Sequence, residues 1–597
     1  MGNHDKFHRG KKALAIIALI FTIAAILLAH SKPTTGYELS IYESTPVYVW
    51  GILALSTLIA LSLIFFSVIF DSENSRFWII GLLILLLNRI SVQWMPYIRG
   101  YYTLSGDQMS NIGYVIDVLN FGHTGLDNFY PITHILLAEI STISNFPPIL
   151  LSNCSTAMMS AFCVISIYLL ARLIFMDRKI CILAVSAAAS VLFSGYDLYL
   201  MPNGWSIHYI PFVFLLFFKS RETRKIEWIF LLILCLLVIP FFHPLTSVFF
   251  IFAFLIVGIT DSVVRKYWHE RPHEISLRSS IPFVQILILS VAFITWITSF
   301  NLFRNNLRTL YLAITTGSGP SFLNELGVAL SKLGMTGIDF MIFIIKSMGH
   351  NAIFLLIAVV AFVVFVRKKG YKEKENGKLM ICFAVSGASI LLYASYLTNL
   401  IPWLEAIGGS RLLAYAMIFT PIFSAWLFLR SISKKRFCSL KVVILVLIIF
   451  TASTMSVLSI HPSPYTKVPG AQISKGDIKA VSWAFSEKEK EIEVSSILSS
   501  MRRYSHLLFG EIHGGEILPH LLITPDHFGY GIHENVGSAI GESRYIVINQ
   551  IDLVAYTTVW SSVGRFSQKD FARLYCDPSI HKLYTSGYSE IWFAVKP

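Results

Sequence analysis

Long apolar runs dominate the pattern of hydrophobic and polar positions along the chain. A bilayer core of roughly 30 Å takes about 20 apolar residues to cross as a helix. Thirteen apolar runs recur, and we expect each to form a transmembrane helix. The run at 338–366 carries Lys346 and His350, so an interfacial helix followed by a span is the alternative there. The runs lie at 12–30, 46–70, 77–95, 150–175, 180–197, 207–218, 226–242, 245–262, 281–300, 338–366, 379–398, 411–430 and 441–460.

Composition supports the same interpretation. Of the 597 residues, 55% are hydrophobic and 14% are charged, and the mean hydropathy is +0.64. A soluble protein of this length is far less apolar. The sequence therefore predicts an α-helical polytopic membrane protein with about 13 transmembrane helices.

The distribution of basic residues predicts the orientation. The positive-inside rule places loops rich in Lys and Arg on the cytoplasmic side. In a thirteen-span arrangement all the basic clusters fall on one side, whereas the segment 96–150 on the other side has only Arg99. We therefore expect a cytoplasmic N-terminus and an extracytoplasmic C-terminus. The clusters are Lys6, Arg9, Lys11 and Lys12; Lys219, Arg221, Arg224 and Lys225; Arg265, Lys266, Arg271 and Arg278; Arg367, Lys368, Lys369, Lys372, Lys374 and Lys378; and Arg430, Lys434, Lys435, Arg436 and Lys441.

The basic pI of about 9.2 follows from these membrane loops. Because the excess of Lys and Arg is explained by the membrane orientation, it does not indicate nucleic-acid binding. We therefore expect the lipid bilayer, and no nucleic acid, to be the partner of the positive charge.

The composition changes after residue 460, where the membrane runs end. The stretches "ESRYIVINQID" and "KLYTSGYSEIWFAV" predict strands, and "GDIKAVSWAFSEKEKE" and "SQKDFARLYC" predict helices. We therefore expect three parts in a multi-pass cell-membrane protein. They are the first two transmembrane helices in 1–76, a transmembrane core in 77–460 with a large outer loop at 96–149, and a small extracytoplasmic α/β domain in 461–597.

The stretch "LSGDQMSN" at 104–111 opens a predicted helix in the large outer loop. Ser105 and Gln108 match a capping box, and Gly122 ends the pattern. The helix dipole favours an ionised carboxylate in the first turn, where Asp107 lies. An apolar face predicts that this helix lies along the outer membrane interface; it consists of Ile112, Val115, Ile116 and Leu119.

Three ionisable residues are predicted at the outer membrane level. Asp107 begins the loop helix, Asp197 follows the fifth span and Arg411 begins the twelfth. Such groups are costly at the membrane unless they have partners, so they are candidates for one shared site. Each also has a structural interpretation. An acid can complement a helix dipole or be solvated in a loop, and an arginine can snorkel to the interface.

Four histidines lie at or near the same face. His123, His134, His208 and His243 could hold a divalent cation such as Mg²⁺ or Mn²⁺ together with the acids. Their spacing matches no known metal motif. A hydrogen-bonded interfacial histidine is the alternative for each, and "FHPLTS" at 242–247 predicts a tight outer turn in which Pro244 opens the eighth span.

The arrangement resembles the GT-C superfamily of membrane glycosyltransferases, which includes dolichyl-phosphate-sugar-dependent mannosyltransferases, aminoarabinose transferases and oligosaccharyltransferases. The resemblance rests on "SGDQMSNIGYVIDVLNFGHTG" with "FYPITH" in a long outer loop, "SRLLAYAMIFTP" late in the membrane part, and the closing "LYTSGYSEIWFAV". It covers the chain from about residue 77. The first two spans are an addition, and the W-W-D-Y-G motif of oligosaccharyltransferases is absent, which argues against transfer to asparagine.

The resemblance implies a role for each candidate. An acid in the first large outer loop, matched by Asp107, acts as the base beside the acceptor. A second acid, matched by Asp197, helps to bind acceptor or metal, with His123, His134 and His208 as supporting candidates. A late arginine, matched by Arg411, holds the lipid-linked phosphate. The implied partners are a polyprenyl-phosphate sugar donor and a glycan, lipid or protein acceptor.

These residue types suit the implied chemistry. Charge builds on the departing phosphate as the sugar passes through an oxocarbenium-like state, so a cation must meet it. The planar fork of arginine can bind two phosphate oxygens, and a carboxylate within hydrogen-bond reach can take the proton of the attacking hydroxyl. A single displacement with inversion is expected.

Two other functions remain alternatives from the sequence. A multi-span transporter or a flippase for lipid-linked saccharides would also have many spans and scattered polar groups, although no internal repeat is visible. The protein could instead be a non-enzymatic surface assembly protein that acts through its C-terminal domain. The large outer loop with an acid favours the enzyme.

Overall fold

The computed structural model describes residues 2–596 except 71–74, 103, 105, 268–281, 317–333, 336, 369, 371–375, 402–403, 405–406 and 433–437. Within the described residues, each predicted apolar run is helical over most of its length, and the run at 180–197 is helical only to Ser190 before the turn at Gly195–Asp197. The helices are α1 (Gly2–His30), α3 (Val47–Phe70), α4 (Phe77–Gln93), α8 (Pro148–Ile174), α9 (Arg178–Ser190), α10 (Pro202–Thr223), α11 (Ile226–Phe242), α12 (Pro244–Tyr267), α13 (Phe283–Ile297), α16 (Gly337–Arg367), α17 (Gly377–Leu397), the pair α18 (Gly409–Met417) and α19 (Thr420–Ile432), and α20 (Cys438–Ile460).

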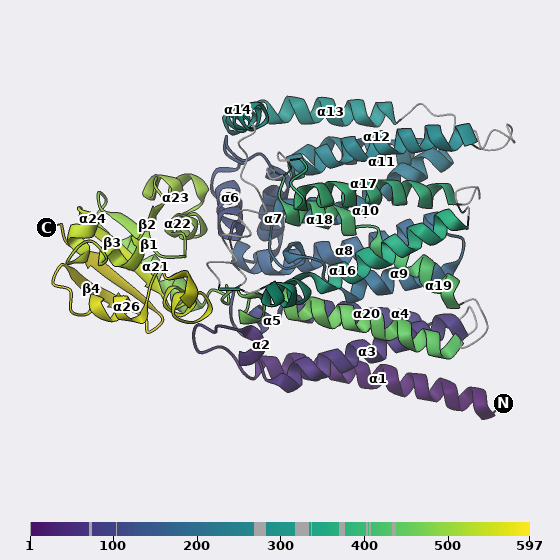
Figure 1. The fold of residues 1–597 in the computed structure, drawn as a ribbon, viewed down its shortest axis with the longest axis horizontal. Helices are drawn as coiled ribbons and strands as arrows, with labels where there is room; N and C mark the ends of the chain where they lie inside the picture. Colours follow the sequence, from purple (N-terminus) through teal and green to yellow (C-terminus); the bar gives the residue numbers. More distant parts are fainter. Residues whose placement is uncertain are drawn as a thin grey trace.

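The helices form a bundle with the N-terminus at one end and the C-terminal domain at the other (Figure 1). Among the described residues, eight helices are long and apolar enough to cross a membrane, and α4, α11 and α13 are apolar but shorter. The prediction of a polytopic α-helical membrane protein is confirmed. The run at 338–366 forms the single 31-residue helix α16, so the alternative of a separate interfacial helix is wrong. Of the basic clusters, Arg271, Arg278, Lys369, Lys372, Lys374, Lys434, Lys435 and Arg436 lie outside the described residues.

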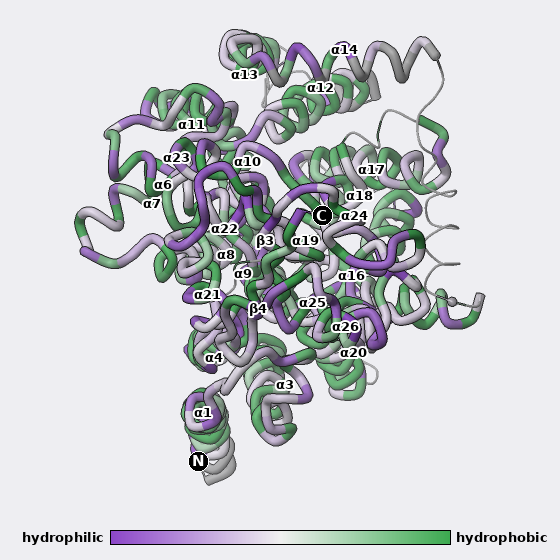
Figure 2. Tube along the Cα trace, turned by 90° about the vertical axis from the view of Figure 1, so that its left-hand side faces the viewer, coloured by the Kyte–Doolittle hydropathy of each residue, from purple (hydrophilic) through white to green (hydrophobic). Residues whose placement is uncertain are grey.

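Polar side chains tie the first helices together inside the bundle. Thr22 of α1 donates to Asn88 Oδ1 of α4 at 2.6 Å, and Asn88 Nδ2 donates to Ser56 of α3 at 3.1 Å. Interhelical hydrogen bonds of this kind stabilise helix packing where lipid offers no alternative partner. Figure 2 shows α1 and α13 at opposite edges of the bundle, with the C-terminal domain in front.

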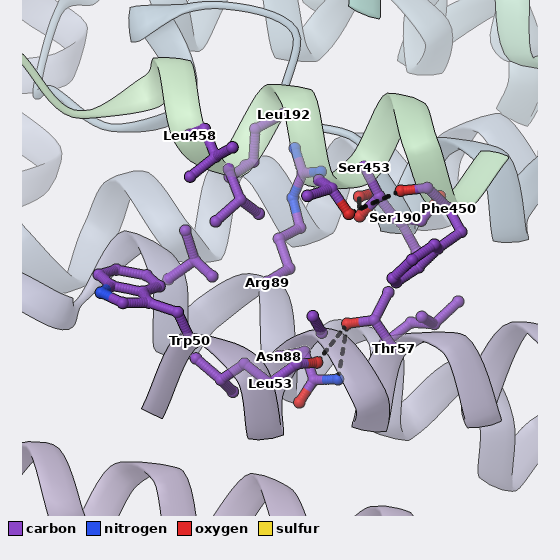
Figure 3. Close-up of a pocket in the computed structure, with 16 residues that line it drawn as sticks. Trp50, Leu53, Thr57, Asn88, Arg89, Ser190, Leu192, Phe450, Ser453 and Leu458 are labelled. Carbon is purple, nitrogen blue, oxygen red and sulfur yellow. Dashed lines mark hydrogen bonds between the residues drawn. The ribbon is translucent and has the colours of Figure 1, made fainter. Parts of the chain in front are cut away.

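A cavity of about 80 Å³ lies between α3, α4 and α20 (Figure 3). Trp50, Asn88, Arg89, Phe450 and Ser453 are among its lining residues. None of the three charged candidates lines this cavity. It belongs to the packing of the N-terminal helices on α20.

Short helices lie between the bundle and the C-terminal domain, where the large outer loop was predicted (Figure 1). Part of a buried apolar cluster here is formed by Met109, Ile112 and Val115 of the loop together with Met501 and Tyr504 of the domain. The short elements outside the spans are α2 (Ile41–Ser44), α5 (Met95–Ile98), α6 (Gln108–Phe121), α7 (Pro131–Ser144), the 3-10 turn η1 (Gly195–Asp197) and α14 (Asn301–Thr316).

The C-terminal domain has the predicted α/β character. Its described strands form one mixed sheet in the order β2-β1-β3-β5-β4, parallel for β2, β1 and β3 and antiparallel for β3, β5 and β4. Both predicted helices and the predicted strands are present. The elements are α21 (Lys475–Glu487), β1 (Glu493–Ser496), α22 (Met501–Phe509), α23 (Glu511–Ile517), β2 (Leu522–Ile523), α24 (Val536–Ile540), β3 (Arg544–Asn549), α25 (Gln550–Val554), α26 (Gln568–Leu574), β4 (Ile580–Thr585) and β5 (Ser589–Ala594).

Candidate functional site

Asp107 is the N-cap residue of α6, but its side chain makes no capping hydrogen bond. An N-cap aspartate usually accepts a backbone N–H of the first turn. Here the carboxylate is 73% exposed, and its Oδ1 accepts a hydrogen bond of 2.6 Å from Arg503 Nη2 of the C-terminal domain. The position of this acid is therefore not explained by capping of its own helix.

The details predicted for α6 are corrected in two respects. The Gln108 side chain donates to Ser152 Oγ at 3.4 Å instead of closing a capping box, and Ser105 lies outside the described residues. Ile112 and Val115 of the face expected to lie against the membrane interface are buried in an apolar cluster that includes Met501 and Tyr504 of the C-terminal domain, whereas Leu119 of that face is exposed. The predicted end at Gly122 is confirmed, with φ of 72° at that glycine.

Tyr130 links the loop helices to the bundle. It precedes α7, and its ring stacks on His243 with centroids 5.6 Å apart and planes 14° apart. His243 directly precedes Pro244 of α12, so the predicted tight turn is confirmed. The stacked rings of Tyr130 and His243 therefore join the outer loop to the turn between α11 and α12.

The charges of Asp107 and Arg411 affect the pKa values of these two stacked residues. Burial raises the pKa of the Tyr130 phenol; the Asp107 charge raises it further and the Arg411 charge lowers it. Burial also lowers the pKa of His243 to about 3, with Arg411 contributing in the same direction. Because such effects weaken with distance, both charges are within electrostatic reach of Tyr130.

Arg411 lies in the first turn of α18 (Gly409–Met417). Its Nη1 donates to the Ile407 carbonyl at 2.9 Å, and the side chain is half-buried. No carboxylate of the described residues forms an ion pair with it. A half-buried guanidinium that forms no ion pair with the described carboxylates is suited to bind an anion such as a phosphate.

Asp197 is buried in a dense polar network. Its Oδ1 accepts from Arg89 Nη2 at 2.7 Å and from Ser160 at 3.0 Å, and it lies 3.0 Å from His208 Nε2. Oδ2 accepts the Phe193 N–H at 2.9 Å. Burial alone would raise the pKa of this carboxyl, but Arg89, His208 and Ser160 together hold it below its usual range. Both carboxylate oxygens are therefore engaged by protein groups.

Two hydroxyl contacts connect α18 with its surroundings, and the first of them involves the turn that carries Asp197. The Tyr196 hydroxyl lies 3.4 Å from Ser410 Oγ, next to Arg411. The Thr246 hydroxyl lies 3.2 Å from that of Tyr415 in α18. The turn that carries Asp197 and the start of α18 are therefore neighbours.

The remaining histidine candidates lie elsewhere. His134 is buried between Asn128, at 2.8 Å, and Asn111 of α6, at 3.2 Å, and burial lowers its pKa to about 3. His123 follows the C-terminal end of α6, stacks on Phe121 and accepts the Gly125 N–H. Since α6 is about 20 Å long at 1.5 Å per residue, His123 lies at the opposite end of that helix from Asp107.

The described side chains do not supply a metal site. No group of three or more His, Cys, Asp or Glu within the described ranges could hold an ion. Asp107 is paired with Arg503 and Asp197 with Arg89, so a cation would compete with a guanidinium at either acid. We derive no step through a metal.

The sequence interpretation missed Arg89, Tyr130 and Arg503. Arg89 was detectable, because a single basic residue inside the apolar run at 77–95 is costly without a buried partner. Tyr130 lies in the quoted "FYPITH", but nothing in the sequence distinguishes it from other interfacial tyrosines. Arg503 is one of many basic residues in the C-terminal domain, and only the fold brings it to Asp107.

The fold matches solved structures of membrane glycosyltransferases. The oligosaccharyltransferase of Archaeoglobus fulgidus, crystallised with zinc and sulfate, is 13% identical, with a TM-score of 0.50 over 82% of this chain and 70% of that one. ArnT from Cupriavidus metallidurans bound to undecaprenyl phosphate is 10% identical over 86% and 97%, with a TM-score of 0.39. The mycobacterial arabinofuranosyltransferase AftD is 13% identical over 88% and 42%, with a TM-score of 0.40.

No protein-family model matches the chain, and no curated protein matches it. The match to the archaeal oligosaccharyltransferase shows a shared fold, a polytopic helical membrane bundle with a C-terminal domain. The GT-C resemblance inferred from the sequence is thereby confirmed at the level of the fold.

Proposed function

We propose that this protein is a membrane glycosyltransferase of the GT-C type. It transfers a sugar from a polyprenyl-phosphate donor to a glycan, lipid or protein acceptor on the extracytoplasmic side of the membrane. The observation that carries the proposal is that the helix of Asp107 and the helix of Arg411 both contact the turn at 196–200. Asn111 Nδ2 of α6 donates to the Leu200 carbonyl at 3.1 Å, and the Tyr196 hydroxyl lies 3.4 Å from Ser410 Oγ of α18. An acid for the acceptor and a cation for the donor are the two charges that the reaction needs.

In the proposed reaction, Asp107 acts on the attacking hydroxyl and Arg411 acts on the leaving phosphate. The Asp107 carboxylate accepts the proton of the acceptor hydroxyl as that oxygen attacks the anomeric carbon. Arg411 meets the negative charge that develops on the departing polyprenyl phosphate. Attack opposite to the leaving group inverts the anomeric configuration in a single displacement.

The other candidates support the site indirectly in this proposal. Asp197 and His208 hold the turn that brings Tyr196 next to Ser410 and the donor arginine. His134 holds Asn111 of α6 against Asn128 and so fixes the helix that carries Asp107. His123 lies too far along α6 to share this task.

Transfer of label from a lipid-linked sugar tests the proposal. The purified full-length protein in lipid nanodiscs is given a panel of radiolabelled dolichyl- and undecaprenyl-phosphate sugars, with native cell membranes as the acceptor. We expect one donor to give labelled product, and Asp107→Asn to lower the rate at least a hundredfold, the lower range for loss of a general base. Asp127→Asn, which changes another exposed acid of the same loop, should keep the wild-type rate.

The donor role of the arginine has its own readout. Arg411→Ala should raise the KM for the lipid-linked donor and lower kcat, because Arg411 meets the phosphate both before and during cleavage. Arg308→Ala, at an exposed arginine of α14, is the matched control. Full turnover in Asp107→Asn would contradict the base. Movement of an intact lipid-linked sugar across vesicles without cleavage would instead support the flippase alternative.

A further inference from the structure

The C-terminal domain contributes a side chain to the neighbourhood of the proposed base. Arg503 lies in α22, almost four hundred residues after Asp107 in the chain, and its Nη2 donates to Asp107 Oδ1 at 2.6 Å. This is the one hydrogen bond of the Asp107 carboxylate among the described residues. Oδ2 has no partner there, and the side chain remains 73% exposed.

The position of α22, which carries Arg503, is set by contacts with α6 that do not involve Asp107. At the other end of α6, Asp117 Oδ2 accepts the N–H groups of Glu511 and Ile512, at 3.0 and 3.1 Å, which begin α23. Between the two ends, His506 Nδ1 lies 3.1 Å from the Ser110 hydroxyl. α22 and α23 are therefore held along the whole of α6.

Close backbone packing makes this interface tight. A Cβ atom at Gly113 of α6 would lie only 2.8 Å from the His506 carbonyl oxygen, and one at Gly510 would lie 2.1 Å from Asp117 Oδ1. A larger residue at Gly113 would clash with backbone atoms, and one at Gly510 would displace the Asp117 carboxylate and strain a backbone with φ of 89°. Arg503 therefore projects toward Asp107 from a helix that packs closely against α6.

The ion pair itself adds little to this docking. Asp107 is 73% exposed and Arg503 is 41% exposed, and exposed pairs contribute little to stability because water and salt screen them. The buried contacts of Asp117 and of the glycines carry the interface instead. Loss of the Arg503 side chain should therefore leave the domain docked.

We propose that Arg503 is a positioning residue for the reaction, which rests on the proposed role of Asp107 as the base. It binds one carboxylate oxygen, Oδ1, and fixes the side-chain rotamer so that Oδ2 faces the acceptor hydroxyl. An unrestrained aspartate samples several rotamers, and misplacement of a catalytic group slows the reaction. The C-terminal domain is therefore required for full activity and does more than cover the membrane part.

Kinetics of Arg503 variants test this inference with the label-transfer assay described above. Arg503→Ala should lower kcat about tenfold, with the KM for the lipid-linked donor within twofold of wild type. Arg503→Lys should recover most of the rate, since it keeps a donor at Oδ1. In an Asp107→Glu background, whose carboxylate is already displaced, Arg503→Ala should have less than a twofold effect, because Arg503 acts through Asp107.

Limited proteolysis separates this role from a structural one. Arg503→Ala should give the wild-type cleavage pattern, whereas Asp117→Ala, which loosens the docking, should release the C-terminal domain faster. An unchanged kcat in Arg503→Ala, or an equal loss in both Asp107 backgrounds, would overturn the inference while leaving the base in place. Full turnover in Asp107→Asn would overturn the proposed function and this inference together.

Discussion

At the scale of single residues, the buried charge of Arg89 is compensated by hydrogen bonds and by an ion pair. Arg89 of α4 donates to Ser160, to the Ala188 and Val191 carbonyls and to Asp197. These contacts satisfy an otherwise costly cation inside the apolar bundle. They also hold the end of α9 against the turn that carries Asp197.

Removal of Arg89 should destabilise the protein strongly. Arg89→Leu leaves the Asp197 carboxylate buried without its main counter-charge, which typically costs about 3–5 kcal/mol. The free energy of unfolding, measured by denaturant titration in detergent, should fall by that order. Arg89→Leu combined with Asp197→Asn should be less destabilised than Arg89→Leu alone, and a larger loss in the double variant would contradict this account.

Asp552 makes the stability of the C-terminal domain depend on pH. Burial raises the pKa of its carboxyl to about 7, with the Asp477 charge adding to the shift against the hydrogen bonds from the Asn549 and Leu498 N–H groups. Since the folded pKa exceeds the ordinary value of 3.8 for an aspartate, the native state holds more protons than the unfolded state between these two pH values. The free energy of unfolding should therefore fall as the pH rises from about 4 to about 7.

Thermal unfolding of the full-length protein at several pH values checks this expectation. The midpoint for the C-terminal domain should be higher at pH 5 than at pH 8. Asp552→Asn should remove most of that difference. A midpoint that rises with pH across this range in the wild-type protein would contradict the assignment.

At the scale of elements, most helices and strands could be predicted from the sequence, because apolar period and length decide them. The thirteen runs and the "KLYTSGYSEIWFAV" hairpin needed no tertiary information. The environment of α6 could not be predicted in the same way. Its apolar face suits a lipid interface and a protein interface equally, and only the position of the C-terminal domain decides between them.

The tight contact of α6 with α22 should be sensitive to a single added side chain. Gly113→Val places new atoms against the His506 carbonyl, where a Cβ would already lie at 2.8 Å. We expect faster hydrogen exchange in α22 and α23 and faster proteolytic release of the C-terminal domain. Asn120→Ala, on the exposed side of α6, should leave both measurements unchanged.

At the scale of the whole molecule, the bundle separates the two ends of the chain (Figure 1). The basic loops predict that the end with the N-terminus is cytoplasmic, which would leave the proposed site and the C-terminal domain outside. The proposed site combines residues from the outer loop, the turns between spans and α18. The sequence predicted that Asp107, Asp197 and Arg411 lie at one membrane level, but not which protein groups contact each of them, since partners such as Arg89 and Arg503 are distant along the chain.

Labelling of thiols in intact cells tests the orientation. Cys576 is exposed and is the only cysteine of the C-terminal domain. A membrane-impermeant maleimide should label Cys576 without permeabilisation, and Cys576→Ser should abolish that labelling. Labelling that appears only after the membrane is opened would place the domain in the cytoplasm and contradict an extracytoplasmic site.

A cryo-EM structure of the full-length protein with a bound polyprenyl phosphate would test the shared site of Asp107 and Arg411 directly. We expect the phosphate within ion-pair distance of the Arg411 guanidinium, beside the Tyr130 and His243 rings and facing the Asp107 carboxylate. A phosphate bound away from Arg411, with Asp107 on a separate surface of the protein, would contradict it.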